Sequence, residues 1–384
     1  MVTRADRGRF AEWWWTVDRF LLAALLILVA GGIVLSFAAS PPVAERLGID
    51  SYHFVKRQAF FAIPAIAVLI GVSFLSPRQV RSTAVVVFGI SFLLLIATLF
   101  FGVEVKGSRR WISLLGMSIQ PSEFLKPAFV VIVAFLLAEA AKGRALPGRL
   151  LAMLTLAMTL APLVAQPDFG QAMLIAIVWG SMFFLAGLSW FLTAILAGLG
   201  VAGLAGAYFL LPHVAGRINR FLDPDSGDNF QVETALDAFV TGGWFGRGPG
   251  EGTVKRVLPD SHTDFVFAVT AEEFGILACG LLALLFAFIV LRGLERARQE
   301  NDAFVRLAIS GLMILFGVQA VINMAVNLHL MPAKGMTLPL ISYGGSSLIA
   351  VALGMGFALA LTRRRPRVDV AFSPYVFGGR ERTA

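Results

Sequence analysis

Long apolar segments separated by short polar connections run along almost the whole chain. A helix needs about 20 consecutive apolar residues to cross the hydrocarbon core of a bilayer, and each segment approaches that length. The pattern predicts an all-α polytopic membrane protein with about ten transmembrane helices and one large extracytoplasmic loop. We expect the spans near residues 20–40, 58–75, 83–102, 124–141, 150–166, 171–188, 190–212, 266–291, 304–328 and 345–362.

An even number of spans places both ends of the chain on the same side of the membrane. Arginine and lysine are concentrated in the N-terminal arm, in alternate loops and in the run 363–365 after the last span. Because basic residues favour the cytoplasmic side, both termini are predicted to be cytoplasmic. The chain then divides into an N-terminal arm (1–19), a membrane domain (20–362) and a cytoplasmic tail (363–384). The long polar stretch 213–264 becomes the extracytoplasmic loop of the membrane domain.

The composition is that of a membrane protein. Of 384 residues, 58% are hydrophobic and 15% are charged, with a mean hydropathy of +0.80, whereas soluble proteins carry about 25% charged residues. The net charge of +8 does not indicate a nucleic-acid partner, because the basic residues are scattered among short loops. The single cysteine, Cys279, excludes a disulfide framework and a cysteine-based metal site. Tryptophans at 13–15 indicate an interfacial anchor, and the first apolar stretch is too long for a cleaved signal peptide.

Asp264 stands at the end of the longest polar loop, where the eighth span begins. A carboxylate there can ionise in contact with water and still lie against a poorly hydrated surface. That position suits a general base acting on a membrane-bound substrate. Nearby, we interpret Asp260 as a turn residue and His262 as an ordinary loop histidine. The glycines between 242 and 252 indicate tight turns and match neither a P-loop nor a dinucleotide-binding motif.

Two pairs of ionisable residues lie in the spans. Glu123 and Lys126 are spaced i, i+3 at the start of the fourth span, so both can lie on one helical face and pair. We favour a structural ion pair here, with a direct contact to substrate as the alternative. Glu272 and Glu273, inside the eighth span, are interpreted as structural residues that bond to the backbone or to a neighbouring helix.

Further charged residues are predicted at the outer ends of the spans. Arg109 and Arg110 occupy one outer loop. Asp168 follows the fifth span and Lys334 lies in the last outer loop. The basic residues can hold a phosphate or diphosphate group, and an acid among them can take a proton from a hydroxyl. An interfacial anchor is the alternative for the two arginines.

Four short motifs, in order along the chain, resemble the signatures of the SEDS family of cell-wall proteins, the FtsW, RodA and SpoVE group. Any one of them would be weak evidence, but four in order across ten spans are specific. The stretch 332–339 contains Lys334 and is similar to the division branch, FtsW, more than to the elongation branch, RodA. The motifs occupy residues 107–112 with 120–126, 166–170, 242–248 with 262–265 and 272–275, and 339–347.

The resemblance implies a peptidoglycan glycosyltransferase that polymerises lipid II into glycan strands during septal cell-wall synthesis. The family's loop aspartate matches Asp264, which would deprotonate the acceptor 4-hydroxyl for an inverting attack, so a second carboxylate is not required. Basic residues and a divalent cation, Mg²⁺ or Mn²⁺, would stabilise the leaving diphosphate, although the sequence displays no metal site. The candidate substrate-binding residues are Arg109, Arg110, Lys126, Glu123, Asp168, Lys334, Ser342 and Tyr343.

The resemblance also implies partners, namely a class B penicillin-binding protein that crosslinks the strands and other membrane proteins of the divisome. The expected location is the bacterial inner membrane at the division septum. Two other functions stay open, a lipid II flippase and a non-catalytic divisome scaffold. A transporter would place its binding charges near the middle of the membrane, whereas these charges are predicted at the outer face. A scaffold has no need for a carboxylate near clustered cations.

Overall fold

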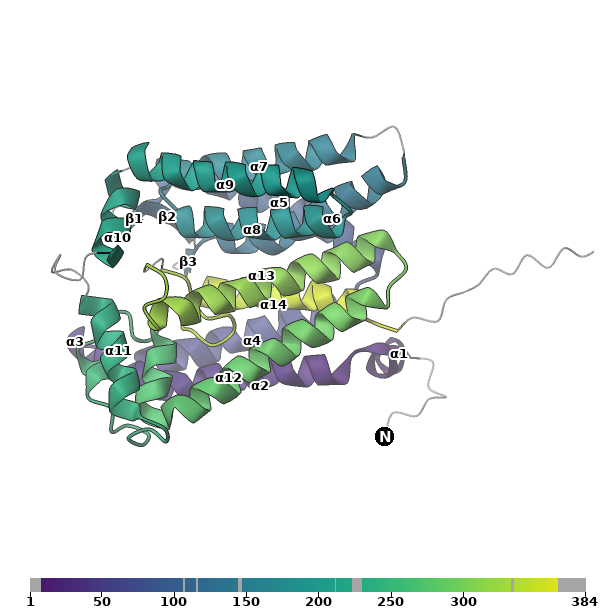
Figure 1. The fold of residues 1–384 in the computed structure, drawn as a ribbon. Coiled ribbons are helices and arrows are strands. Elements are labelled where there is room, and N and C mark those ends of the chain that lie inside the picture. The colour runs from purple at the N-terminus through teal and green to yellow at the C-terminus, as the bar shows by residue number, and fades with distance from the viewer. Residues whose placement is uncertain are drawn as a thin grey trace, which may run out of the picture.

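The computed structural model describes residues 8–105, 108–114, 117–143, 147–210, 212–222, 230–332 and 335–364. In this part of the chain, long helices run side by side and form one bundle (Figure 1). The helices are α1 (Arg9–Thr16), α2 (Arg19–Ala39), α3 (Pro41–Arg46), α4 (His53–Ser73), α5 (Pro77–Phe101), α6 (Pro121–Ala141), α7 (Gly148–Ala165), α8 (Phe169–Leu185), α9 (Trp190–Leu210), α10 (Pro212–Leu222), α11 (Phe230–Gly242), α12 (Val266–Arg298), α13 (Ala303–Asn327) and α14 (Gly345–Leu361).

Ten of these helices coincide with the ten predicted spans. Within the described residues, eight helices are long and apolar enough to cross a membrane, namely α2, α4, α5, α6, α7, α9, α12 and α13. The other two, α8 and α14, are apolar helices of 17 residues each. The prediction of a polytopic α-helical membrane protein is therefore confirmed.

The helices begin at residues that can satisfy free backbone N–H groups. Ser76 precedes α5 and forms a capping box with Gln79, while Pro77 occupies the first helical position, where no N–H is needed. Asp302 accepts hydrogen bonds from two backbone N–H groups at the start of α13. These capping residues fix the positions at which α5 and α13 begin.

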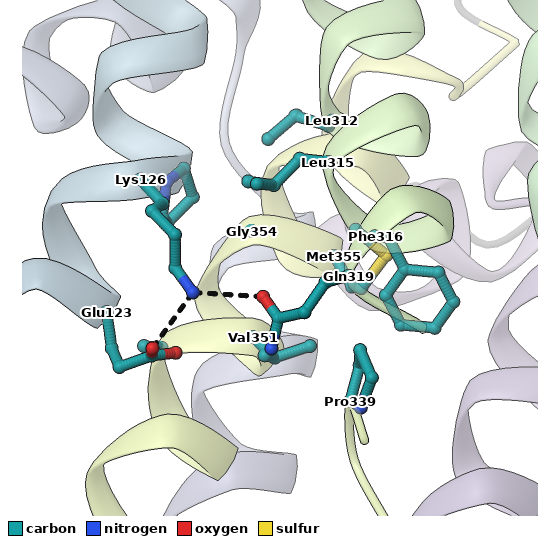
Figure 2. Close-up of a pocket in the computed structure, with 12 residues that line it drawn as sticks. Glu123, Lys126, Leu312, Leu315, Phe316, Gln319, Pro339, Val351, Gly354 and Met355 are labelled. Carbon is teal, nitrogen blue, oxygen red and sulfur yellow. Dashed lines mark hydrogen bonds and ion pairs between the residues drawn. The ribbon is translucent and has the colours of Figure 1, made fainter. Parts of the chain in front are cut away.

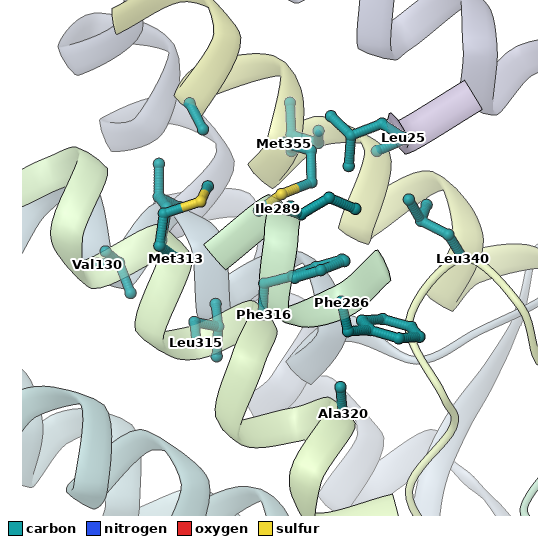
Figure 3. Close-up of a cluster of buried hydrophobic side chains, with 14 of the residues drawn as sticks. Leu25, Val130, Phe286, Ile289, Met313, Leu315, Phe316, Ala320, Leu340 and Met355 are labelled. Atoms are coloured by element: carbon teal, nitrogen blue, oxygen red, sulfur yellow. The ribbon is translucent and has the colours of Figure 1, made fainter. Parts of the chain in front are cut away.

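Helices α6 and α13 form the centre of the bundle. In the most apolar 18-residue stretch of each helix, 67% of the residues of α6 and 72% of those of α13 are buried. The corresponding share in α9, at the edge of the bundle, is 6%. Figure 3 shows the packing around α13, where Phe316 lies beside Phe286 and Ile289 of α12, with the two phenylalanine ring centroids 5.3 Å apart. The apolar side chains that remain exposed on the outer helices are suited to contact lipid.

One end of the bundle, which we call the sheet end, carries a small antiparallel sheet with strand order β1-β2-β3. Its strands are β1 (Val103–Val105), β2 (Ser108–Leu114) and β3 (Met117–Ile119). Helices α3, α10 and α11 lie at the same end (Figure 1). The sequence predicted only loops for these regions, so the sheet and the two helices inside the stretch 213–264 are new features.

The opposite end, the terminal end, brings both described ends of the chain together. The backbone N–H of Arg364 donates to the carbonyl of Thr16 at 3.0 Å. Asp18, which caps α2, binds Arg292 and Arg296 of α12 at 2.8 and 2.7 Å. Burial alone would raise the pKa of Asp18, but the hydrogen bonds from both arginines lower it overall.

The predicted tryptophan anchor divides into two parts. Trp13 is only 3% exposed, donates from Nε1 to Ser73 Oγ at 2.7 Å and stacks on Phe74 with ring centroids 4.8 Å apart. It therefore fastens α1 to the end of α4, and the prediction of an interfacial role is wrong for this residue. Trp14 and Trp15 are exposed, as an interfacial anchor requires.

Candidate functional site

A cavity of about 720 Å³ lies at the sheet end. Its walls come from β2, α6, α8, α10, α11, α13 and the loops that precede α12 and α14. Asp264, Arg110, Glu123 and Tyr343, which were predicted as site residues, all line it. Segments far apart in the sequence thus meet around one space, which is large enough for part of a sizeable ligand.

Asp264 is held in the cavity wall by a turn that leads into α12. Its backbone N–H donates to the carbonyl of Asp260 at 3.1 Å, and its side chain is partly exposed. Gly335 lies directly beside the carboxylate, because a Cβ at that position would lie 3.6 Å from Asp264 Oδ2. Gly335 has φ +63°, a conformation that glycine adopts without strain. The glycine therefore leaves the space beside the carboxylate open.

Arg110 is the described cation that the sheet presents to this cavity. It lies on β2 next to Arg109, and neighbouring residues of a strand point to opposite faces. The Arg110 side chain is 17% exposed, whereas that of Arg109 is 52% exposed and pairs with Glu104 at 3.4 Å. The structure therefore brings Arg110 to the site and directs Arg109 to the surface.

Asp168 reaches the site through Arg110. Its Oδ1 lies 3.5 Å from Arg110 Nη1, and Arg110 Nη2 donates to the carbonyl of Pro167 at 3.0 Å. Asp168 also caps α8, where it accepts a hydrogen bond from the Gln171 N–H. Burial raises the pKa of Asp168, and the Arg110 guanidinium counteracts part of that rise. Asp168 thus holds the arginine in place more directly than it could hold a substrate.

The Glu123–Lys126 pair forms as predicted and is buried. Lys126 Nζ donates to Glu123 Oε1 and to Gln319 Oε1, both at 2.9 Å (Figure 2). Glu123 also accepts from Gln171 Nε2 at 2.7 Å and from Ser347 Oγ at 3.1 Å. The Lys126 side chain is 2% exposed, so the geometry supports the structural ion pair over a direct contact of Lys126 with substrate.

The loop before α14 carries two of the predicted site residues, Tyr343 and Ser342. Tyr343 lines the cavity, and its backbone N–H donates to the carbonyl of His262 at 2.9 Å. Burial raises the pKa of Tyr343 and lowers the pKa of His262 to about 4, so both are neutral at pH 7. The Ser342 hydroxyl accepts from the Leu338 N–H at 2.8 Å and holds the turn. Lys334 lies outside the described residues.

Glu272 and Glu273 attach the start of α12 to the preceding loop, which confirms their structural interpretation. Glu272 accepts hydrogen bonds from the backbone N–H groups of three consecutive residues, 253–255, and Glu273 pairs with the Lys255 ammonium. Helix α12 is broken two residues later at Gly275, which has φ 82° and ψ 173°. The segment that follows Asp264 is therefore fixed by charged contacts.

Sequence reasoning missed the amide side chains at this site. Gln171 and Gln319 bind the Glu123–Lys126 pair, and Asn323 and Asn327 both donate to the backbone carbonyl of Asp264. The spacing of four residues between the amides of α13 was visible in the sequence, but the hydrogen-bond partners of these amides were not. Among the described residues, no group of three or more His, Cys, Asp or Glu side chains could hold a metal ion.

Comparison with known proteins agrees with this architecture. Residues 18–366 match the FtsW/RodA/SpoVE family of cell cycle proteins. The chain is 47% identical over 378 residues to a probable peptidoglycan glycosyltransferase FtsW of Caulobacter vibrioides, covering 98% of this chain and 96% of that one. It is 35% identical to a protein of the same name from Trichlorobacter lovleyi, covering 86% and 89%.

Two solved structures share the fold over nearly their whole length. A chain from a peptidoglycan synthase complex that coordinates polymerization and crosslinking is 30% identical, with a TM-score of 0.73 and coverage of 90% of this chain and 97% of that one. The rod shape determining protein RodA of Thermus thermophilus is 29% identical, with a TM-score of 0.66 and coverage of 91% and 97%. The chain therefore belongs to the FtsW/RodA/SpoVE family, the SEDS proteins whose signatures its four motifs resemble.

Proposed function

We propose that this protein is a peptidoglycan glycosyltransferase, the activity that the names of its FtsW relatives state as probable. Its reaction would polymerise lipid II during septal wall synthesis. The observation that carries the proposal is the cavity at the sheet end, where Asp264 and Arg110 line the same space. A carboxylate can act as a base there, and a guanidinium can bind a diphosphate. Lipid II contributes both the hydroxyl and the diphosphate.

The reaction follows from these two groups. Asp264 takes the proton of the acceptor 4-hydroxyl as the oxygen forms a bond to the anomeric carbon of the donor sugar. The bond from that carbon to the lipid diphosphate breaks, and the diphosphate leaves with the electron pair. The configuration at the carbon inverts in this single displacement, so no covalent enzyme intermediate forms. Arg110 stabilises the negative charge that develops on the leaving diphosphate.

A divalent cation fits the donors at this site. Mg²⁺ is usually held by one or two carboxylates together with substrate phosphates, and Asp260 lines the same cavity as Asp264. Asp260 is the residue that would hold the cation beside the diphosphate. When bound, such a cation would neutralise part of the diphosphate charge.

The proposal includes a location and a partner. The sheet end would face outward and both termini the cytoplasm, in the inner membrane at the division septum, which agrees with the basic residues near the terminal end. A class B penicillin-binding protein would crosslink the product strands, with further divisome membrane proteins in the assembly. The similar chain from a peptidoglycan synthase complex supports such a partnership.

The test compares wild type with Asp264→Asn, each purified with its penicillin-binding protein and supplied with labelled lipid II and Mg²⁺ or Mn²⁺. Loss of a general base costs about 10²- to 10⁴-fold in rate, so the variant should yield no long strands. Asp237→Asn is the matched control, because Asp237 is an exposed residue of α11 at the same end. Strong polymerisation by Asp264→Asn would refute the assignment of the base. Inactive wild type in an intact complex would favour a flippase or a scaffold.

A further inference from the structure

Helix α13 carries three amide side chains at intervals of four residues on an otherwise apolar helix. Gln319, Asn323 and Asn327 are 3%, 1% and 0% exposed. Residues four apart lie one above the other on the same helical face, so the three form a polar stripe along α13. A buried amide requires hydrogen-bond partners, because leaving it unpaired is costly. The partners therefore show what the stripe does.

Asn327 joins the end of α13 to the start of α12. Its Nδ2 donates to the backbone carbonyl of Asp264 at 3.0 Å, and its Oδ1 accepts from the Ala268 N–H at 3.1 Å. Ala268 lies in the first turn of α12, where N–H groups have no partner within the helix. Asn327 therefore caps α12 from a neighbouring helix and at the same time binds the residue that lines the cavity just before it.

Asn323 joins two segments that line the cavity. Its Nδ2 donates to the same Asp264 carbonyl at 2.9 Å and to the carbonyl of Met336 at 2.6 Å. Met336 lines the cavity together with Gly335, the residue that lies beside the Asp264 carboxylate. Asn323 thus links the backbone of Asp264 to the backbone of Met336.

Gln319 extends the stripe to the buried ion pair. Its Nε2 donates to the carbonyl of Thr337 at 3.2 Å, and its Oε1 accepts from Lys126 Nζ at 2.9 Å (Figure 2). Gln319 and Asn323 thus hold adjacent residues of the loop 335–337, Thr337 and Met336. Gln319 also ties this loop to Lys126 on α6.

From these contacts we infer that Asn323 and Asn327 are positioning residues, which set the place of the Asp264 carboxylate by holding its backbone carbonyl with two amide donors. The inference rests on the proposed role of Asp264 as the base. A general base must lie within hydrogen-bond reach of the proton it takes. A shift of about 1 Å in a reacting group can cost about 100-fold in rate.

Three variants test the inference in the purified complex with labelled lipid II. Asn323→Ala removes one donor, and Asn327→Ala removes the other together with the cap of α12. Asn327→Asp keeps an acceptor for the Ala268 N–H, where a carboxylate at a helix N-terminus is favourable, but its ionised form cannot donate to Asp264. The control is Asn219→Ala, because Asn219 is exposed on α10 and bonds to Tyr208 at 2.9 Å.

The inference predicts that kcat falls about 10- to 100-fold while KM stays within about twofold in Asn323→Ala and Asn327→Asp. The affinity for labelled lipid II, measured in proteins that also carry Asp264→Asn, should not change when either asparagine substitution is combined with it. A variant with only a structural defect would lose binding and kcat together. Asn219→Ala should match wild type in all three quantities.

Several outcomes would overturn the inference. One is wild-type kcat in both Asn323→Ala and Asn327→Asp, and another is a rise in KM with kcat unchanged, which would indicate contact with substrate. If Asn327→Ala does not fold, Asn327→Asp decides the question, since it retains the cap. Asp264→Asn is assayed in the same series. If Asp264→Asn is active, the proposed base is wrong, whereas an inactive Asp264→Asn with active asparagine variants refutes the positioning role alone.

Discussion

Replacing Lys126 with methionine separates a structural role of this residue from a role in substrate binding. The substitution removes the ammonium group and keeps an unbranched side chain that can fill the same space. Glu123 retains its hydrogen bonds from Gln171 at 2.7 Å and Ser347 at 3.1 Å, but loses its cationic partner at 2.9 Å. Gln319 loses the donor to its Oε1. A carboxylate would then remain inside the bundle without a neutralising charge.

The expected loss of stability is large because both members of the pair are buried. The Lys126 and Glu123 side chains are 2% and 4% exposed, so solvent does not screen the remaining charge. Removing one partner of a buried ion pair costs about 3–5 kcal/mol. By contrast, the exposed Arg109–Glu104 pair should contribute no more than about 1 kcal/mol.

The second substitution, Glu123→Gln, should reverse most of this loss. The double variant Lys126→Met/Glu123→Gln contains no buried charge at this place, and replacement of a buried ion pair by uncharged groups is often neutral. The glutamine Oε1 can still accept a hydrogen bond from Gln171 or Ser347. We expect the free energy of unfolding to fall in the single variant and to recover in the double variant.

Thermal unfolding of the purified proteins in detergent measures stability, and binding of labelled lipid II measures the site. Lys126→Met should unfold at a lower temperature, while the double variant should unfold near wild type and still bind lipid II. A single variant as stable as wild type would refute the argument from burial. A double variant that is stable but no longer binds lipid II would show that the Glu123–Lys126 pair takes part in substrate binding.

Three further predictions concern other parts of the molecule. Arg110→Ala should lower kcat/KM for lipid II about 10- to 100-fold through lost charged hydrogen bonds to the diphosphate, whereas Arg109→Ala should change it less than about twofold in the same steady-state assay. Asp18→Asn should lower the melting temperature at pH 7. Because the folded pKa of Asp18 is depressed, its contribution is present above the unfolded pKa of about 3.9 and is lost as pH falls through the folded pKa. The difference in melting temperature between the two proteins should therefore stay constant down to about pH 4 and shrink only below it, as the pH falls through the folded pKa of Asp18. A difference that is already lost between pH 7 and about pH 5 would contradict this account. Gly275→Ala should destabilise the protein, because Gly275 has φ +82° and a Cβ there would clash with the backbone oxygen of Trp244. Gly280→Ala on the same helix meets no atom within 4 Å and should change the free energy of unfolding by less than about 1 kcal/mol in chemical denaturation.

The membrane-spanning part of the fold was predictable because the length of an apolar segment strongly constrains where the segment can lie. A segment of about 20 apolar residues has few stable places other than the bilayer core. The limits of that signal are visible in α12, which was predicted to end near 291 and continues to Arg298. Its last turns are polar, and Arg292 and Arg296 bind Asp18 there. Hydropathy detects the part of a helix in lipid and not the part beyond it.

The sheet end was less predictable because its elements are short and depend on pairing. Strands β1 and β3 have three residues each, and their formation requires β2 between them. The same pairing decides which arginine faces the cavity, since Arg109 and Arg110 are equivalent by residue type and differ only in the face of β2. The sequence offered both arginines as candidates, and the structure places Arg110 in the cavity wall.

The amide stripe of α13 shows where such reasoning ends. Gln319, Asn323 and Asn327 could be recognised as a polar face on an apolar helix, because their spacing of four is helical. Their acceptors include the backbone carbonyls of Asp264 and Met336, which every residue possesses and which therefore leave no trace in the sequence. A hydrogen bond between two side chains requires a suitable residue type at both positions. A hydrogen bond from a side chain to a backbone carbonyl requires a suitable residue type only at the position of the side chain. Residues that position a proposed base through its backbone are for this reason identified from structure, even where the candidate base itself is suggested by the sequence.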